Sequence, residues 1–320
     1  MNAPKASTGP LVVVLGTGGT IAGTARSSTD SVGYRAASLG VEALVAAVPP
    51  LADWAIECRQ VAQLDSKDMS VAVWLALLAE LRQQLQRPEV GGVVVTHGTD
   101  TLEETAYFLH RVLEADKPVV LTAAMRPATS LQPDGPQNLL DAATLARCSD
   151  MRGVLAVLGG RVFAAADLRK QHGWRVDAFG SGDVGPLGCL QDGVLQRYRD
   201  PPAAHRHVAA TALPTDAVVW PWVEIVVSHA EARGAVIDAL CAAGVQGIVI
   251  AGTGNGSVHE ALLQAARRAI DAGVPVVRAT RCLLSGVFGQ PQDALRSYGV
   301  LTPWQARIEL TLDLLRARGP

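Results

Sequence analysis

The feature that most constrains the fold is the alternation of short apolar runs, rich in β-branched residues, with longer segments of helical periodicity. The first run, residues 11–15, ends in a glycine turn, as expected for a parallel strand that is buried on both faces. The other predicted strands cover residues 93–96, 119–122, 154–158, 218–227, 248–251 and 274–278. The predicted helices cover residues 71–85, 102–113, 137–147, 232–243 and 258–272. This order predicts an α/β fold with a doubly wound, mainly parallel sheet, whose reactive groups lie beyond the carboxyl ends of the strands.

Residues 198–214 interrupt this alternation. The segment, YRDPPAAHRHVAATALP, has no clear apolar period and carries three prolines, which is typical of a connection between domains. A chain of 320 residues is long enough to bury two separate cores. We therefore predict a large N-terminal domain over residues 1–197, a linker over 198–214 and a smaller second α/β domain over 215–320.

The composition argues against several classes of partner. The formal net charge is −2, so neither a nucleic acid nor an anionic membrane surface is an expected partner. No apolar run approaches the roughly 20 residues that a membrane-spanning helix needs, and the N-terminal segment MNAPKASTGP lacks the apolar stretch of a signal peptide. The five cysteines never form a CxxC motif, which is typical of a protein from a reducing compartment. We expect a cytoplasmic protein.

A turn rich in threonine and glycine follows the first predicted strand, in VLGTGGTIAG (residues 14–23). Its glycines permit a tight turn and a close approach of the backbone to a ligand. The segment is not a dinucleotide-binding fingerprint, because Ile21 stands where the third glycine of G-x-G-x-x-G belongs. Three hydroxyls surround the glycines, those of Thr17, Thr20 and Thr24. Taken alone, such a turn is also compatible with a polar loop that has no catalytic role.

A second polar turn follows another predicted strand, in VVVTHGTDTLEETAYFL (residues 93–109). Taken alone, Thr99 and Asp100 are explained as capping groups of a helix whose first turn holds Glu103 and Glu104. Two hydroxyl-rich turns at the ends of parallel strands can, however, converge at one crevice. Together they would supply two candidate nucleophiles beside a carboxylate.

The two segments together resemble the paired signatures of bacterial L-asparaginases in the asparaginase/glutaminase family. VLGTGGTIA (14–22) and GVVVTHGTDTL (92–102) match these signatures, and the similarity continues in order through almost the whole chain. The further matching segments are GVEALVAAVP (40–49), DSKDM (65–69), ETAYFL (104–109), KPVVLTAAMRP (117–127), DGPQNL (134–139), GNGSV (254–258) and TPWQAR (302–307). The sequences of the AMRP and DGPQNL segments are more similar to those of the periplasmic, type II branch, although we identify no export signal.

The resemblance implies hydrolysis of L-asparagine to L-aspartate and ammonia, with a minor glutaminase activity. It assigns Thr20 as the nucleophile that forms an acyl-enzyme, and Tyr34 as the group that takes up its proton. A threonine hydroxyl is barely acidic and needs such a partner. Residues 21–33 would form a mobile lid that excludes water when it closes. Anchoring of this lid by packing is the alternative role of Tyr34.

Thr99, Asp100 and Lys170 match the second triad of the family, which activates the second threonine or the water. Lys170 is informative, because the chain has only four lysines among its 28 basic residues and arginine cannot release its proton. The alternative is an exposed lysine on a loop. The resemblance also implies that Asp100 binds the substrate's α-amino group and that Ser66 binds its α-carboxylate. Backbone N–H groups near Thr99 and Ala124 would stabilise the oxyanion.

Asn255 would come from the second domain. In the family a neighbouring subunit contributes to each site, which implies a homotetramer built from tight dimers with shared active sites. Two positions depart from the type II pattern: Lys67 replaces a glutamine, and Gln292 aligns near an acidic residue of the partner subunit, with Asp293 adjacent. Both changes weaken attraction for an ammonium group. We expect lowered affinity for asparagine, or tolerance of substrates without a charged α-amino group, unless Lys67 is turned to solvent.

No metal or organic cofactor is expected, because the seven histidines lack a metal-ligand spacing such as HExxH. His97 is expected to brace its turn. Two other functions remain as alternatives. The same signatures occur in an amidotransferase subunit that acts on a tRNA-linked substrate, but that protein carries an additional domain before the first signature, which begins here at Val14. A sensor of amino acids without turnover would not need both Thr20 and Thr99.

Overall fold

The computed structural model describes residues 9–202, 213–289 and 295–318. The chain forms two compact units, Met1–Arg206 and His207–Pro320. Part of the predicted linker, residues 203–212, lies outside the described residues. The backbone N–H groups of Tyr198 and Arg199 both donate to the carbonyl of Leu187, so the start of the predicted linker is held to the first unit.

The first unit is built on an eight-stranded sheet with the order β10-β9-β6-β5-β4-β3-β1-β2. Strands β1 to β5 are parallel to one another, and the pairs β5–β6, β6–β9 and β9–β10 are antiparallel. The bounds are β1 Leu11–Gly18, β2 Ile56–Leu64, β3 Val90–Thr96, β4 Pro118–Thr122, β5 Gly153–Leu158, β6 Arg161–Ala164, β9 Gly188–Gln191 and β10 Val194–Arg197. A separate two-stranded ribbon pairs β7 (Arg169–Lys170) with β8 (Phe179–Gly180).

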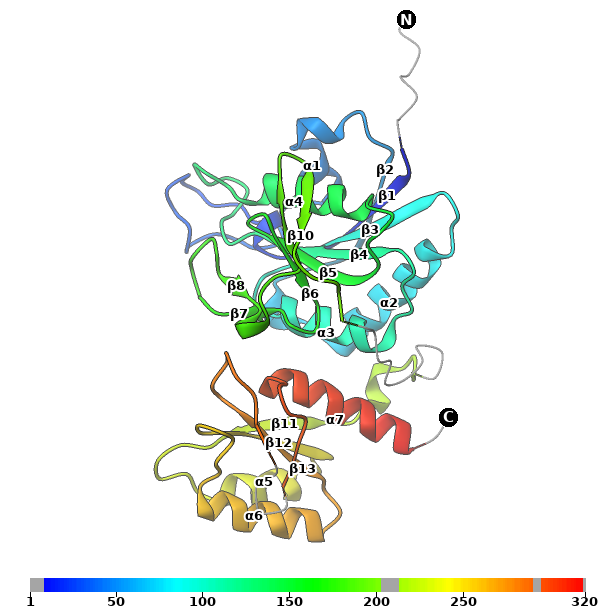
Figure 1. The fold of residues 1–320 in the computed structure, drawn as a ribbon. Helices are drawn as coiled ribbons and strands as arrows, with labels where there is room; N and C mark the ends of the chain where they lie inside the picture. The colour runs from blue at the N-terminus through cyan, green and yellow to red at the C-terminus, as the bar shows by residue number, and fades with distance from the viewer. Residues whose placement is uncertain (1–8, 203–212, 290–294, 319–320) are drawn as a thin grey trace, which may run out of the picture. The chain divides into compact units, whose positions relative to one another are not determined.

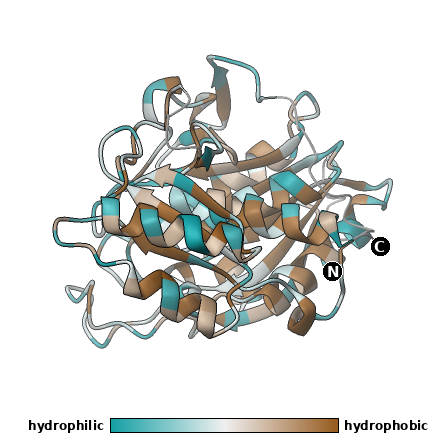
Figure 2. Ribbon diagram, turned by 90° about the horizontal axis from the view of Figure 1, so that it is seen from below, coloured by the Kyte–Doolittle hydropathy of each residue, from teal (hydrophilic) through white to brown (hydrophobic). Residues whose placement is uncertain are grey.

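Helices cover both faces of this sheet (Figure 1). Helices α1 (Val41–Ala46) and α4 (Gly135–Ala146) lie on one face, and α2 (Val71–Leu85) and α3 (Leu102–Val112) lie on the other. Successive side chains of a strand point to opposite faces, so both faces of the central strands must be apolar. Figure 2 shows hydrophobic residues along the strands and on the helix surfaces that pack against them. This is the predicted doubly wound, mainly parallel sheet.

The second unit is a smaller parallel sheet with the order β11-β12-β13-β14. Helices α5 and α6 pack on one face of it and α7 packs on the other. The bounds are β11 Val223–Val227, β12 Gly247–Gly252, β13 Val276–Thr280, β14 Arg296–Ser297, α5 Ala235–Ala242, α6 Glu260–Asp271 and α7 Pro303–Ala317. A second α/β unit is therefore present, as the sequence predicts. None of the helices in the described ranges has the length and apolarity that a bilayer crossing requires.

The strand predicted over residues 218–227 is too long at its start. A short 3-10 helix, Ala217–Val219, stands there instead, and the side chain of Asp216 accepts a hydrogen bond from the Val218 N–H at 2.9 Å. Pro221, which has no N–H to donate to a ladder, separates this helix from β11.

Candidate active site

The two threonine-bearing turns meet beyond the carboxyl ends of β1 and β3. These strands are parallel neighbours, with Gly16 opposite Thr96. In the turns that follow, the backbones approach so closely that a Cβ on Gly19 would lie 2.2 Å from the Cα of Gly98. Gly19 also has a φ of 84°, which favours glycine. Glycine at positions 19 and 98 therefore allows the Thr20 turn to pack against the Thr99 turn.

Thr20 is buried and contacts Tyr34 directly. Its Oγ1 lies 2.7 Å from the Oη of Tyr34, and either hydroxyl can donate. Tyr34 is held there by a short antiparallel bridge, in which Thr24 and Arg35 exchange two backbone hydrogen bonds of 2.9 Å. The segment expected to form a lid, residues 21–33, thus starts directly after Thr20 and ends beside Tyr34, which contacts the Thr20 side chain. Within this segment, the carbonyl of Ser28 accepts a hydrogen bond from the N–H of Leu131.

The second group of predicted residues also comes together. The Nζ of Lys170, on the ribbon strand β7, donates to Oγ1 of Thr99 at 3.0 Å and to Oδ1 of Asp100 at 2.6 Å. The Lys170 side chain is only 15% exposed, whereas the Asp100 side chain is 51% exposed. Lys170 is therefore not the exposed loop lysine of the alternative interpretation. Asp100 keeps an open side that a ligand can reach.

Glu103 supports Lys170 from helix α3. Its buried carboxylate accepts a hydrogen bond of 3.3 Å from the backbone N–H of Lys170. The sequence interpretation placed Glu103 in the first turn of a helix and gave it no further role. No local signal distinguishes a glutamate that complements a helix dipole from one that also fixes a distant strand.

Ser66 lies against the same turn. Its Oγ accepts a hydrogen bond of 3.2 Å from the backbone N–H of Asp100, and its carbonyl accepts one of 2.7 Å from the hydroxyl of Thr101. A Cβ on Gly98 would lie 2.4 Å from the Ser66 Oγ, so glycine is needed there too. Ser66 is buried beside the peptide that precedes Thr99.

Lys67, the next residue, binds carboxylates of its own loop. Its Nζ lies 2.9 Å from Asp68 and 3.0 Å from Asp65, and the side chain is 61% exposed. The hydrogen bonds to Asp68 and then to Asp65 raise the pKa of Lys67. Its positive charge is therefore largely compensated by two neighbouring carboxylates, which the sequence interpretation did not consider.

Ala124 is buried at the turn between β4 and α4. A Cβ on Gly135 would lie 2.9 Å from the Cγ1 of Ile21 and 3.4 Å from the Cβ of Ala124, so the turn lies beside the residue that follows Thr20. The carboxylate of Asp134 holds the turn by accepting the N–H groups of Met125 and Arg126, both at 2.9 Å. The Thr20, Thr99 and Ala124 turns thus lie close together at the carboxyl ends of β1, β3 and β4.

Asn255 lies in the second unit, in the loop after β12. Its side-chain amide forms two hydrogen bonds with the backbone of Phe288, at 2.8 Å to the carbonyl and 2.7 Å from the N–H. Gln292 and Asp293 lie outside the described residues.

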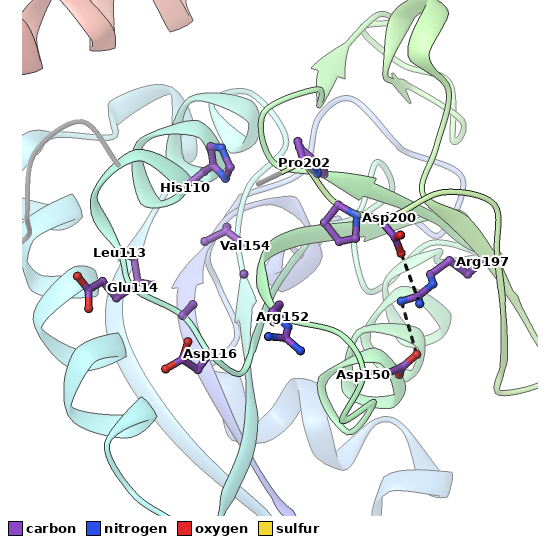
Figure 3. Close-up of a pocket in the computed structure, with 14 residues that line it drawn as sticks. His110, Leu113, Glu114, Asp116, Asp150, Arg152, Val154, Arg197, Asp200 and Pro202 are labelled. Atoms are coloured by element: carbon purple, nitrogen blue, oxygen red, sulfur yellow. Dashed lines mark ion pairs between the residues drawn. The ribbon is translucent and has the colours of Figure 1, made fainter. Parts of the chain in front are cut away.

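A separate cavity of about 490 Å³ lies beside the amino end of β5 (Figure 3). It is lined by residues from the end of α3 and the start of β5, including His110 and Val154, and by the ion pairs that Arg197 forms with Asp150 and Asp200. None of the predicted site residues lines it. The threonines, the lysine and the carboxylate lie instead where open α/β sheets bind their ligands, beyond the carboxyl ends of the strands.

An α/β sheet with two threonines, a lysine and a carboxylate close together at the carboxyl ends of its strands has the composition of an acyl-transfer site. The family description "Asparaginase, N-terminal" matches residues 11–203, and "Glutaminase/Asparaginase C-terminal domain" matches residues 222–319. The chain belongs to this asparaginase/glutaminase family.

Individual relatives match over nearly the whole chain. The chain is 38% identical to L-asparaginase 2 of Escherichia coli (strain K12), over 97% of this chain and 90% of the relative. It is 37% identical to the glutaminase-asparaginase of Acinetobacter glutaminasificans, over 95% of each. Among solved structures, a probable cytoplasmic L-asparaginase from Campylobacter jejuni superposes with a TM-score of 0.89 at 36% identity, covering 95% of both chains.

Proposed function

We propose that this chain hydrolyses the side-chain amide of L-asparagine to L-aspartate and ammonia through an acyl-enzyme on Thr20, with minor activity on glutamine. The observation that carries the proposal is two groups of hydrogen bonds on neighbouring turns: Thr20 with Tyr34, and Lys170 with Thr99 and Asp100. A relative named glutaminase-asparaginase supports the second substrate.

In the first half-reaction, Oγ1 of Thr20 attacks the amide carbon, and its proton passes through the hydroxyl of Tyr34 to the leaving nitrogen. Ammonia departs and an ester to Thr20 remains. The Oη of Tyr34 is within hydrogen-bond reach of the nucleophile, as this transfer requires. In the second half-reaction, water attacks the ester and Thr20 regains its proton.

The group of Thr99, Lys170 and Asp100 activates the second threonine or the attacking water. The Lys170 amine sits between the Thr99 hydroxyl and a carboxylate, and unlike a guanidinium it can exchange a proton. The open side of Asp100 binds the substrate's α-ammonium. The hydroxyl of Ser66 accepts the Asp100 N–H and keeps its own hydrogen to donate to the α-carboxylate.

Assembly and location belong to the same proposal. We expect a homotetramer built from dimers with shared active sites, to which Asn255 contributes from the second unit. We also expect a cytoplasmic enzyme. A structural neighbour named as a probable cytoplasmic L-asparaginase supports this location, although a relative from Haemophilus influenzae is named as periplasmic.

Ammonia release from asparagine and glutamine by the purified protein tests the function. Thr20→Ala should lower kcat at least about a thousandfold, because it removes the nucleophile. Thr24→Ala is the matched control, since it removes a hydroxyl from the same turn and leaves the backbone bridge to Arg35, and it should stay within about threefold of the wild type. A wild-type protein that binds asparagine without releasing ammonia would instead be a sensor.

A further inference from the structure

We propose that Trp74, Thr105 and His97 are positioning residues, which form a buried hydrogen-bond relay that fixes the Gly98–Thr99 peptide and thereby aims the Thr99 N–H into the crevice. This inference rests on the proposed function. It assigns a role to two side chains, on α2 and α3, that lie away from the reacting atoms.

The relay consists of three hydrogen bonds. Nε1 of Trp74 lies 2.9 Å from Oγ1 of Thr105, Oγ1 of Thr105 lies 2.9 Å from Nε2 of His97, and Nδ1 of His97 lies 2.7 Å from the carbonyl oxygen of Gly98. His97 and Thr105 are fully buried and Trp74 is 6% exposed. Trp74 is fixed in turn by stacking on Phe108, with ring centroids 4.8 Å apart.

The donors and acceptors of this relay permit one arrangement. The indole N–H of Trp74 can only donate, and the carbonyl of Gly98 can only accept. Nδ1 of His97 must therefore carry a hydrogen, and in a neutral ring Nε2 then accepts from the Thr105 hydroxyl. Burial supports the neutral ring, since it lowers the pKa of His97 to about 4. An imidazole held in one tautomer orients its neighbours and does not exchange protons with substrate.

Fixing the Gly98 carbonyl fixes the Thr99 N–H. In a trans peptide these two groups point in opposite directions, and the carbonyl is drawn into the buried side of the turn. The Thr99 N–H then points away from His97, and no acceptor for it is recorded within the described part of the chain. A preorganised N–H of this kind is suited to stabilise an oxyanion.

The preceding peptide, between His97 and Gly98, lies against the nucleophile turn. A Cβ on Gly19 would lie 2.4 Å from the nitrogen of Gly98 and 2.9 Å from the carbonyl carbon of His97. The Cα of Gly98, which the two peptides share, would lie 2.2 Å from the same Cβ, so a shift of Gly98 would displace Gly19, which precedes Thr20. The relay consequently fixes the positions of Thr20 and Thr99 together.

Two pairs of variants separate positioning from mere stability. Thr105→Val replaces the central hydroxyl by a methyl group of similar size and should lower kcat about tenfold while KM changes less than about threefold. Thr144→Val in α4 is the matched control, because its hydroxyl only bonds the Leu140 carbonyl one turn earlier, and kcat should stay within about twofold. Equal kcat values for the two variants would overturn the inference.

The histidine itself offers a rescue test. In His97→Asn the amide nitrogen takes about the place of Nδ1 and still donates to Gly98, whereas in His97→Gln it takes about the place of Nε2 and does not. His97→Asn should therefore retain at least about fivefold more kcat than His97→Gln at similar melting temperature. The opposite order, or no difference, would refute the relay.

A readout besides activity keeps this inference separate from the proposed function. Imidazole ¹⁵N spectra at neutral pH should show one histidine, absent from His97→Asn, as the pure Nδ1–H tautomer. If the wild type releases no ammonia but shows this tautomer, the proposed function fails and the relay stands. A rapidly exchanging or Nε2–H ring would overturn the relay in an active enzyme.

Discussion

At the scale of single residues, Thr20 forms a hydrogen-bonded pair with Tyr34, and Lys170 forms a second group with Thr99 and Asp100. The resemblance pointed to Thr20, Tyr34, Thr99, Asp100 and Lys170, and the structure brings the first two and the last three into contact. Contacts of Lys67 could not be predicted in the same way. Its orientation is decided by competition between a substrate and two carboxylates one and two residues away, and a motif match does not measure that competition.

Replacement of Lys170 by arginine tests whether the amine must exchange a proton. Arginine keeps the charge beside Asp100 but cannot be deprotonated, so Lys170→Arg should lower kcat at least about a hundredfold with a much smaller change in KM. Lys117→Arg is the matched control, because that lysine is also partly buried, donating at 2.6 Å to the Arg87 carbonyl, and lies outside the site. Steady-state kinetics of both variants decide the matter. Substantial activity of Lys170→Arg would leave Lys170 with a purely electrostatic role.

Replacement of Lys67 by glutamine tests the effect of its charge on affinity. Removal of a cation near the α-ammonium subsite should lower KM for asparagine. The decrease should be no more than about threefold, because Lys67 is exposed and already paired with two carboxylates. Asp68→Asn should have the opposite effect, because it frees part of the lysine charge. KM measured at low and high salt checks both. An unchanged KM in Lys67→Gln would mean that this side chain takes no part in substrate recognition.

At the scale of elements, apolar periodicity located α2 and the central strands but missed other long elements, the partly exposed strand β2 and the helix α7. The helix predicted over residues 71–85 has the bounds of α2, and the central parallel strands lie where continuous β-branched runs predict them. The ribbon of β7 and β8 has two residues per strand, too short for any period. It is held by tertiary contacts such as the one from Glu103, and yet it carries Lys170.

Asn138 shows how the start of one helix fixes the turn that follows β4. This buried amide, in the first turn of α4, donates to the Ala123 carbonyl and accepts the Gly159 N–H, both at 2.9 Å, and so ties the ends of β4 and β5 together. Asn138→Ala should destabilise the protein by about 2–3 kcal/mol, because two buried backbone groups lose their partner. Urea unfolding measures this, with the exposed neighbour Gln137→Ala, expected within about 0.5 kcal/mol, as the control. Equal stability of the two variants would mean that water replaces the amide.

At the scale of the whole molecule, sequence predicted two α/β units from the loss of periodicity after residue 197. The structure shows what holds the chain just after this predicted boundary. Strand β10 ends at Arg197, but the chain remains bound to the first unit through Tyr198 and through Arg199, whose guanidinium donates to Asp167 at 2.7 Å. A polar segment without a period can still be packed, because hydrogen bonds and ion pairs hold it where apolar contacts do not.

Shared active sites can be tested by complementation between two inactive variants. If Thr20 of one subunit works with Asn255 of another, Thr20→Ala and Asn255→Ala should each be nearly inactive as pure assemblies. Refolded together at equal amounts, they should regain about one quarter of the wild-type sites, since half of the dimers are mixed and each mixed dimer has one site with both residues intact. Mass measurement should give an assembly of about four chains of 33.5 kDa.

Mixing Thr20→Ala with Lys170→Met is the control, because both residues lie in the first unit beside one crevice. If each site draws that whole crevice from a single subunit, this mixture should stay inactive, whereas a failure of the first mixture to regain activity would place every residue of the site in one chain.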